Sequence, residues 1–203
     1  LNLGCIPTKS LIQAAKIYTL TKKAGSFGIE VQNPKPNFNK IQERKDRIIQ
    51  QLSQGMHFML GGVDLINEQA KLTSNNEIKA GNQTIKAKFI IIACGSKPME
   101  LAFLKFDGKK ILSSNEILNL KDIPDSLLVV GGGVIGCEFA SLFSGLGTQV
   151  SIIEKMPQLL PGMDKDAAKK LETILKKKGV KIYTDTDAKT ADPHKKFDNR
   201  HAE

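Results

Sequence analysis

The feature that most constrains this fold is a glycine-rich loop, Gly131-Gly132-Gly133-Val134-Ile135-Gly136. A short apolar run over 127–130 precedes the loop and has the character of a buried strand, and a helical pattern over 134–146 follows it. A strand that ends in a G-x-G-x-x-G loop and leads into a helix is the arrangement typical of dinucleotide binding. We therefore expect an α/β domain around this loop.

The segments after the loop continue the same alternation of strand and helix. The sequence predicts a strand over 149–153, a helix over 164–178 and a strand over 180–184. Strands that alternate with helices imply a parallel sheet with right-handed crossovers. Gly145 and Gly147 are expected to close the helix that begins at the loop.

An acidic residue stands where such a domain needs one, because Glu154 follows Gly136 by 18 residues at the end of the next strand. We expect Gly131 to make the tight turn, Gly133 to let the backbone approach a pyrophosphate, and Gly136 to permit close packing of helix on strand. Glu154 would accept hydrogen bonds from the ribose and repel a 2′-phosphate, which predicts NAD over NADP. The alternative is a structural turn with an incidental surface glutamate.

Glu138 lies two residues after the last loop glycine. A generic interpretation makes it a first-turn acid that offsets the helix dipole.

The first part of the chain carries a second candidate site at Cys5. Pro7 opens a helical pattern that lasts until Gly25, so Cys5 falls at or just before a helix N-terminus with Lys9 one turn further on. The helix dipole and a nearby cation would stabilise a thiolate there. Spacing alone leaves open the alternative of a small buried residue in a turn.

The segment between residues 33 and 94 is predicted to contain one helix and three strands. An apolar stripe that begins at Ile41 and ends at Met59 marks the helix, which Gly61-Gly62 would end. Strand-like pieces cover 63–66, 69–73 and 84–94, and the last holds the continuous apolar run 89–92 of a buried strand. If its sheet is incomplete, that run would be exposed and prone to aggregation.

Composition excludes several classes of protein for these 203 residues. A hydrophobic fraction of 40% is too high for a disordered tail, no apolar run is long enough to span a bilayer, and three cysteines are too few for a disulfide scaffold. The net charge of +9 could suggest nucleic acid or membrane binding, but its lysines gather at helical spacing with few aromatics, which favours solvated helix faces. We expect no nucleic acid, membrane or metal partner.

Several segments resemble the flavin-dependent pyridine nucleotide–disulfide oxidoreductases, and within that family the dihydrolipoamide dehydrogenases. Residues 1–9, Leu-Asn-Leu-Gly-Cys-Ile-Pro-Thr-Lys, are similar to the family's redox-active segment, and residues 91–98 to its flavin-side strand. The resemblance continues through 113–118, the glycine loop, 160–165 and 186–188. It implies FAD and NAD as cofactors and oxidation of a dihydrolipoyl dithiol through disulfide, flavin and NAD.

The resemblance also implies roles for individual residues. Cys5 would be the thiol next to the flavin, and Lys9 would lie near the flavin N5 edge. Glu138 would lie near the nicotinamide, with NAD held by the loop and by Glu154. The remaining positions implied to contact cofactor are Ala93, Cys94 and Gly95 at the FAD, and Ala188 on the adenine side. Cys94 stands where the family usually has threonine and is expected to be a small buried residue.

The chain departs from the family at its ends. It begins with Leu1 rather than Met, so we expect a segment of a longer protein, and the partner of Cys5 would stand just before Leu1. Such a fragment is expected to be inactive alone, because a thiol–disulfide cycle needs two sulfurs. For the longer parent protein, the resemblance implies the lipoyl domain of a 2-oxo acid dehydrogenase or glycine cleavage complex as partner, and the full-length family forms homodimers.

The sequence therefore predicts a Rossmann-like, doubly wound α/β domain for NAD together with an incomplete FAD-binding domain. The expected boundaries are 1–123 for the FAD part, 124–189 for the NAD part and 190–203 for an unstructured tail. A reactive thiol without a disulfide framework suits the reducing cytoplasm. Two alternatives stay open: another flavoprotein disulfide reductase, like glutathione or mercuric reductase, and a non-catalytic NAD-binding remnant of a disrupted gene.

Overall fold

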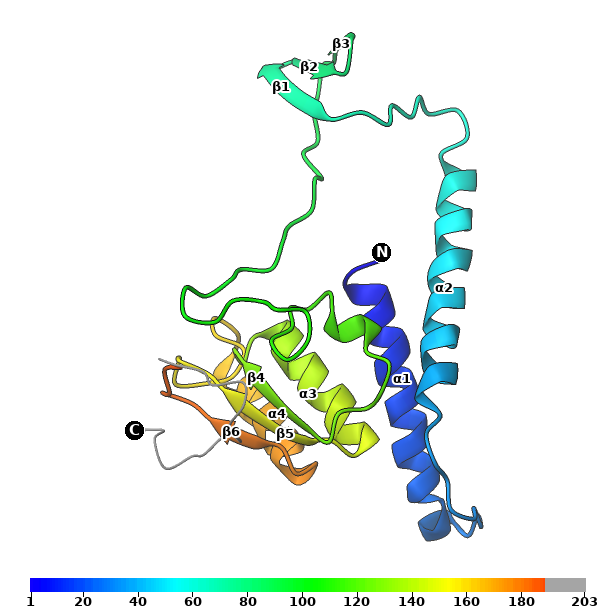
Figure 1. Ribbon diagram of the computed structural model, residues 1–203, viewed down its shortest axis with the longest axis vertical. Helices are drawn as coiled ribbons and strands as arrows, with labels where there is room; N and C mark the ends of the chain where they lie inside the picture. Colours follow the sequence, from blue (N-terminus) through cyan, green and yellow to red (C-terminus); the bar gives the residue numbers. More distant parts are fainter. Residues whose placement is uncertain (189–203) are drawn as a thin grey trace. The chain divides into compact units, whose positions relative to one another are not determined.

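The computed structural model describes residues 1–188 (Figure 1). By contacts these residues form two compact units, one made of Leu1–Ser53 with the chain from Glu100 onward, the other of Gln54–Met99. This division follows the packing of the chain. The boundary expected near residue 123 instead separates the FAD part from the NAD part, and it stays a prediction. The tail expected over 190–203 lies outside the described residues.

The first unit contains the α/β alternation that the sequence predicts. Its strands β4, β5 and β6 pair in that order, and both pairings are parallel. The elements are β4 (Ser126–Val130), α3 (Val134–Leu146), β5 (Gln149–Ile153), α4 (Lys165–Lys177) and β6 (Lys181–Tyr183). The predicted parallel sheet is confirmed, and each of these elements begins and ends within two residues of its expected limits.

Local chemistry explains why these helices begin where they do. Gly133 is the residue before α3, and the apolar side chains of that helix, including Phe139, Leu142 and Phe143, enter the core. Asp164 caps α4, since its Oδ1 accepts a hydrogen bond from the Ala167 N–H at 3.0 Å. Only Ala168 and Leu175 of α4 are fully buried, so its lysines lie on the solvated face that the spacing predicts.

Helix α1 (Cys5–Lys22) packs along α3 in the same unit, and Figure 1 shows the two helices side by side. Their contacts run in one direction, from Lys9 with Glu138 to Ala15 with Gly145, so the helices are parallel and their N-termini share one end. A Cβ on Gly145 would lie 3.3 Å from the Cβ of Ala15. Gly145 therefore lets two helices approach closely, and the expectation that it closes α3 is wrong. Gly147 alone is the left-handed C-cap.

Helix α2 (Phe38–Met59) begins in the first unit, after a short 3₁₀ turn η1 (Ala24–Phe27). Its Lys45 is only 3% exposed, and the Nζ atom donates to the Leu118 carbonyl at 3.0 Å, in the 3₁₀ turn η2 (Ile117–Asn119). The predicted helix is confirmed. Its apolar stripe is half-buried at Ile41 but exposed at Met59, so the stripe packs only over its first turns.

The second unit is an antiparallel meander with strand order β1-β2-β3. Its strands are β1 (Ala70–Ser74), β2 (Glu77–Ala80) and β3 (Gln83–Lys86). β1 confirms the strand expected over 69–73, whereas the strand expected over 63–66 does not form and β2 was missed.

The strand expected over 84–94 is wrong beyond Lys86, where β3 ends. The apolar run 89–92 has no strand beside it within residues 1–188, and the side chains of Phe89, Ile91 and Ile92 are more than 70% exposed. An apolar run becomes a buried strand only where neighbouring strands take up its backbone N–H and C=O groups. The exposure anticipated for this run is confirmed.

Within residues 1–188, none of the helices combines the length and apolar character that crossing a bilayer requires.

The close approach of α1 to α3 predicts a strong cost for any larger side chain at Gly145. Gly145→Val should lower the free energy of unfolding by about 1–3 kcal/mol, because the new methyl groups must displace Ala15 or Thr19. Urea denaturation followed by circular dichroism measures this. Gly55→Val is the matched control, since Gly55 is also helical and a Cβ there meets nothing within 4 Å. Equal effects of the two substitutions would contradict the close packing.

Candidate functional site

The glycine loop makes a sharp turn between β4 and α3. Gly131 has a φ of +105°, which side chains rarely adopt, and its N–H donates to the Ile153 carbonyl at 2.8 Å. A Cβ on Gly136 would collide with the carbonyl oxygen of Gly131 and press against Val129 at 3.0 Å. The helix therefore lies directly on the strand because Gly136 has no side chain.

Glu154 lies beneath this loop and is only 6% exposed. Its Oε2 accepts the Gly132 N–H at 2.6 Å, and its Oε1 accepts the Met156 N–H at 2.7 Å. The alternative of an incidental surface glutamate is therefore wrong. Each carboxylate oxygen can accept more than one hydrogen bond, so these contacts leave capacity for a ribose hydroxyl.

The outer side of the loop is open. A Cβ on Gly133 would meet nothing within 4 Å, and the side chains of Val134 and Ile135 are exposed. The first N–H groups of a helix have no partner within the helix, and its dipole favours negative charge. An exposed helix N-terminus behind a loop with room for a ligand can hold a pyrophosphate.

Cys5 and Lys9, two of the residues predicted to lie beside the flavin, belong to the first turns of α1. Cys5 is the first residue of α1 and is exposed with a free thiol. One turn along, the Nζ atom of Lys9 donates to Oε1 of Glu138 on α3 at 2.6 Å. The structure thus brings together the residues expected beside the flavin and the one expected beside the nicotinamide.

This ion pair changes the interpretation of Glu138. Glu138 is the fifth residue of α3 and lies beyond the first turn, so the expectation that it offsets the dipole as a first-turn acid is wrong. The hydrogen bond to Glu138 is the main cause that raises the pKa of Lys9, and the charges of Glu138 and Cys5 add to it. The pairing was missed because 129 residues separate its members and no periodicity links them.

The other predicted cofactor residues lie in the second unit or at the end of the described chain. Ala93, Cys94 and Gly95 belong to the second unit, in a stretch without regular secondary structure. Cys94 is exposed, so the expectation of a small buried residue is wrong. Its burial was expected on the assumption that 84–94 forms an internal strand. Ala188, the last described residue, is half-buried.

Sequence reasoning also missed a contact inside the loop. The Cys137 thiol is buried and donates to the Gly132 carbonyl at 3.3 Å. Its only signal in the sequence is a cysteine one residue after the last loop glycine, a position where any small residue fits a helix.

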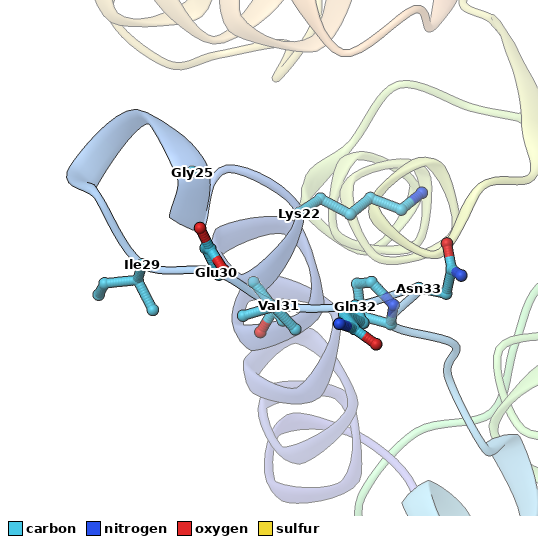
Figure 2. Close-up of a pocket in the computed structure, with 9 residues that line it drawn as sticks. Lys22, Gly25, Ile29, Glu30, Val31, Gln32 and Asn33 are labelled. Carbon is cyan, nitrogen blue, oxygen red and sulfur yellow. The ribbon is translucent and has the colours of Figure 1, made fainter.

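A shallow pocket of about 580 Å³ lies far from these residues, at the other end of α1 (Figure 2). Among the residues that line it, Figure 2 shows Lys22 and Asn33 on the right and Ile29 on the left. None of the predicted site residues lines this pocket. Within residues 1–188 no group of three or more His, Cys, Asp or Glu side chains is placed to hold a metal ion.

A nucleotide loop and an exposed thiol on adjacent helix N-termini define a class of flavin-linked oxidoreductases, and comparison with known proteins agrees. The family model for pyridine nucleotide-disulphide oxidoreductases matches residues 1–202, and the chain belongs to that family.

Individual relatives narrow the resemblance. The chain is 40% identical to a dihydrolipoyl dehydrogenase of Bacillus subtilis over 94% of its own length and 45% of the relative's. It is 38% identical to a dihydrolipoyl dehydrogenase of Acholeplasma laidlawii, covering 96% of this chain and 60% of the relative. Among solved structures, LpdA from Mycobacterium tuberculosis matches with a TM-score of 0.81 and 27% identity over 93% of this chain and 43% of that one. The chain thus spans roughly half the length of these relatives.

The Lys9–Glu138 contact predicts a measurable change in the titration of Lys9. Glu138→Gln should lower the pKa of Lys9, because its strongest hydrogen-bond partner loses its charge. NMR of ¹³C-methylated lysine measures this pKa directly. A raised lysine pKa stabilises the fold below the ordinary value of 10.5, and this contribution is lost as pH rises through the folded value. An unchanged pKa would contradict the contact, and Glu172→Gln, on α4, is the control.

Proposed function

We propose that this chain is the part of a dihydrolipoyl dehydrogenase in which the redox-active thiol meets the NAD loop. The observation that carries the proposal is the 2.6 Å contact of Lys9 with Glu138, since it joins the Cys5 helix to the helix of the glycine loop. The relatives support the substrate, because the chain is 34% to 40% identical to three enzymes of that name. The whole enzyme would act on a dihydrolipoyl group.

In the proposed reaction the dihydrolipoyl dithiol becomes a disulfide and releases two electrons and two protons. NAD⁺ accepts a hydride, so one proton leaves to solvent. FAD, when bound, supplies the electron transfer between the disulfide and the nicotinamide. Cys5 would be the thiol next to the flavin and one half of a disulfide with a second cysteine. The dihydrolipoyl dithiol would reduce that disulfide by exchange, and the exposed position of Cys5 at the start of α1 leaves room for the reaction.

The residues around Cys5 would hold and orient the reacting groups. Lys9 would place a positive charge near the flavin N5 edge, and Glu138 would hold that ammonium group on the nicotinamide side. The open N-terminus of α3 would bind the pyrophosphate, and Glu154 the adenosine ribose. Ala93, Cys94 and Gly95 would contact the FAD, and Ala188 the adenine side. We infer a lipoyl domain and a second copy as partners, and the cytoplasm as compartment, where a free Cys5 thiol persists.

Glu154 gives the nucleotide preference its own test. The 203-residue chain should bind NADH at least about tenfold more tightly than NADPH, because a 2′-phosphate would face the buried carboxylate. Glu154→Ala should reduce this ratio. The ratio is informative where affinity alone is not, since loss of the Gly132 contact weakens both nucleotides equally. Fluorescence titration gives both affinities, with Asp166→Ala as the control. An unchanged ratio would refute the ribose assignment.

The substrate is best tested in a chimera. Residues 1–188 would replace the matching segment of the Bacillus subtilis relative, so that the thiol, Lys9, Glu138 and Glu154 all come from this chain. We expect dihydrolipoamide-dependent reduction of NAD⁺ within about tenfold of the parent, and its loss in Cys5→Ser.

Two outcomes of this experiment would contradict the proposal. A folded chimera that reduces glutathione disulfide or mercuric ion with NADPH would place the chain in another branch of the family. A folded chimera that binds NADH but never turns over would indicate a non-catalytic remnant.

A further inference from the structure

Gly132 is held at both ends of its backbone by groups from three segments. Its N–H donates to Oε2 of Glu154 at 2.6 Å. Its carbonyl oxygen accepts the Leu160 N–H at 2.8 Å and the Cys137 thiol at 3.3 Å. A Cβ on this residue would lie 2.5 Å from Cδ2 of Leu159, so the backbone is closely packed as well. No other residue of the loop has this number of partners among the described residues.

The carbonyl of Gly132 and the N–H of Gly133 belong to one peptide group. Because that group is planar and trans, its carbonyl and its N–H point in opposite directions. The carbonyl points inward, to Leu160 and Cys137. The Gly133 N–H therefore points away from Leu160 and Cys137, and it donates no hydrogen bond to any described residue. A Cβ on Gly133 would meet nothing within 4 Å, so there is open space beside this residue. Any contact that fixes the Gly132 carbonyl therefore also fixes the direction of the Gly133 N–H.

Among the described residues, Cys137 provides the only side chain that donates a hydrogen bond to the inner carbonyl of Gly132. The residue is 4% exposed and lies in the first turn of α3, so helix and loop are joined by its thiol. A carbonyl oxygen has two lone pairs, and the Leu160 N–H uses one of them. The thiol uses the second. With two donors on its carbonyl, the Gly132–Gly133 peptide cannot rotate as freely as it could with the Leu160 contact alone.

The protonation state of Cys137 suits a donor. Burial, then the charges of Glu154 and Glu138, raise the pKa of the Cys137 thiol to about 11. The group therefore keeps its proton at neutral pH and can donate to the Gly132 carbonyl. A buried thiol also takes no part in the chemistry proposed for Cys5.

We propose that Cys137 is a positioning residue for the nucleotide loop: its thiol fixes the Gly132–Gly133 peptide so that the Gly133 N–H faces the bound phosphate. The thiol and the Glu154 carboxylate thus hold opposite ends of Gly132. The proposal rests on the proposed NAD function, since it assigns the Gly133 N–H to that ligand. Cys137 would thus affect nucleotide binding by orienting the loop, without touching the nucleotide itself.

Isosteric variants separate this role from simple packing. Cys137→Val keeps an apolar group of similar size without a donor, whereas Cys137→Ser keeps a donor in a smaller side chain. We expect the Kd for NADH to rise about threefold to tenfold in Cys137→Val and to stay within about twofold of wild type in Cys137→Ser. If Cys137 only filled space, the Kd for NADH would rise more in Cys137→Ser than in Cys137→Val. NADH binding of Cys137→Val equal to wild type would overturn the proposal.

A second pair of variants covers failure of the valine protein to fold. Cys137→Ala and Cys137→Ser lose nearly the same volume, and only the serine can donate, so tighter NADH binding by serine supports the proposal and equal binding contradicts it.

A measurement that needs no nucleotide tests the role of Cys137 independently of the proposed function. Hydrogen exchange of the Leu160 amide, which shares the Gly132 carbonyl, should be faster in Cys137→Ala than in Cys137→Ser. If wild type does not bind NADH, the proposed function fails while the exchange rates still report on the contact. Equal exchange in the two variants would show that the thiol does not hold the peptide.

Discussion

The packing of α1 on α3 is the interaction on which the rest of the site depends. These helices come from distant parts of the chain, and they approach closely because Gly145 offers no side chain to Ala15 and Thr19. Leu11 and Phe143 are fully buried in the same core, so the contact is apolar along most of its length. The polar link between Lys9 and Glu138 lies at the end where both helices begin. The register of the two helices is thus set by a close apolar contact at one end and by charge at the other.

This arrangement places two helix N-termini at the same end of the unit. Cys5 begins one helix, and the glycine loop leads into the other. Parallel helix dipoles repel each other slightly, and an anion at the shared positive end relieves that repulsion. A thiolate and a pyrophosphate are both anions of this kind. Glu138 lies beyond the first turn of α3 and neutralises Lys9, so it leaves the N–H groups of the loop available.

The sequence predicted those parts of the structure whose determinants are local. The glycine loop, the helices around it and the parallel strands were found because periodicity and turn residues are read within a few positions. The run 89–92 was misread because a strand is defined by its neighbours, and Phe89 has none in the described chain. The ion pair of Lys9 and the thiol contact of Cys137 depend on how elements pack, which no local pattern reports. Glu154 was located correctly in the sequence, but its hydrogen bonds to the backbone beneath the loop were not foreseen.

If helix α1 tilted about its close contact with Gly145, the helix would act as a lever on Cys5. From Ala15 to Cys5 is ten residues, or about 15 Å at the rise of an α-helix. A tilt of about 5° at the pivot would then move the sulfur by roughly 1.3 Å, a displacement of the size that can cost an enzyme about a hundredfold in rate. The Lys9–Glu138 pair lies near the moving end and restrains that swing. The close contact of Gly145 with Ala15 therefore helps to fix where the Cys5 thiol lies.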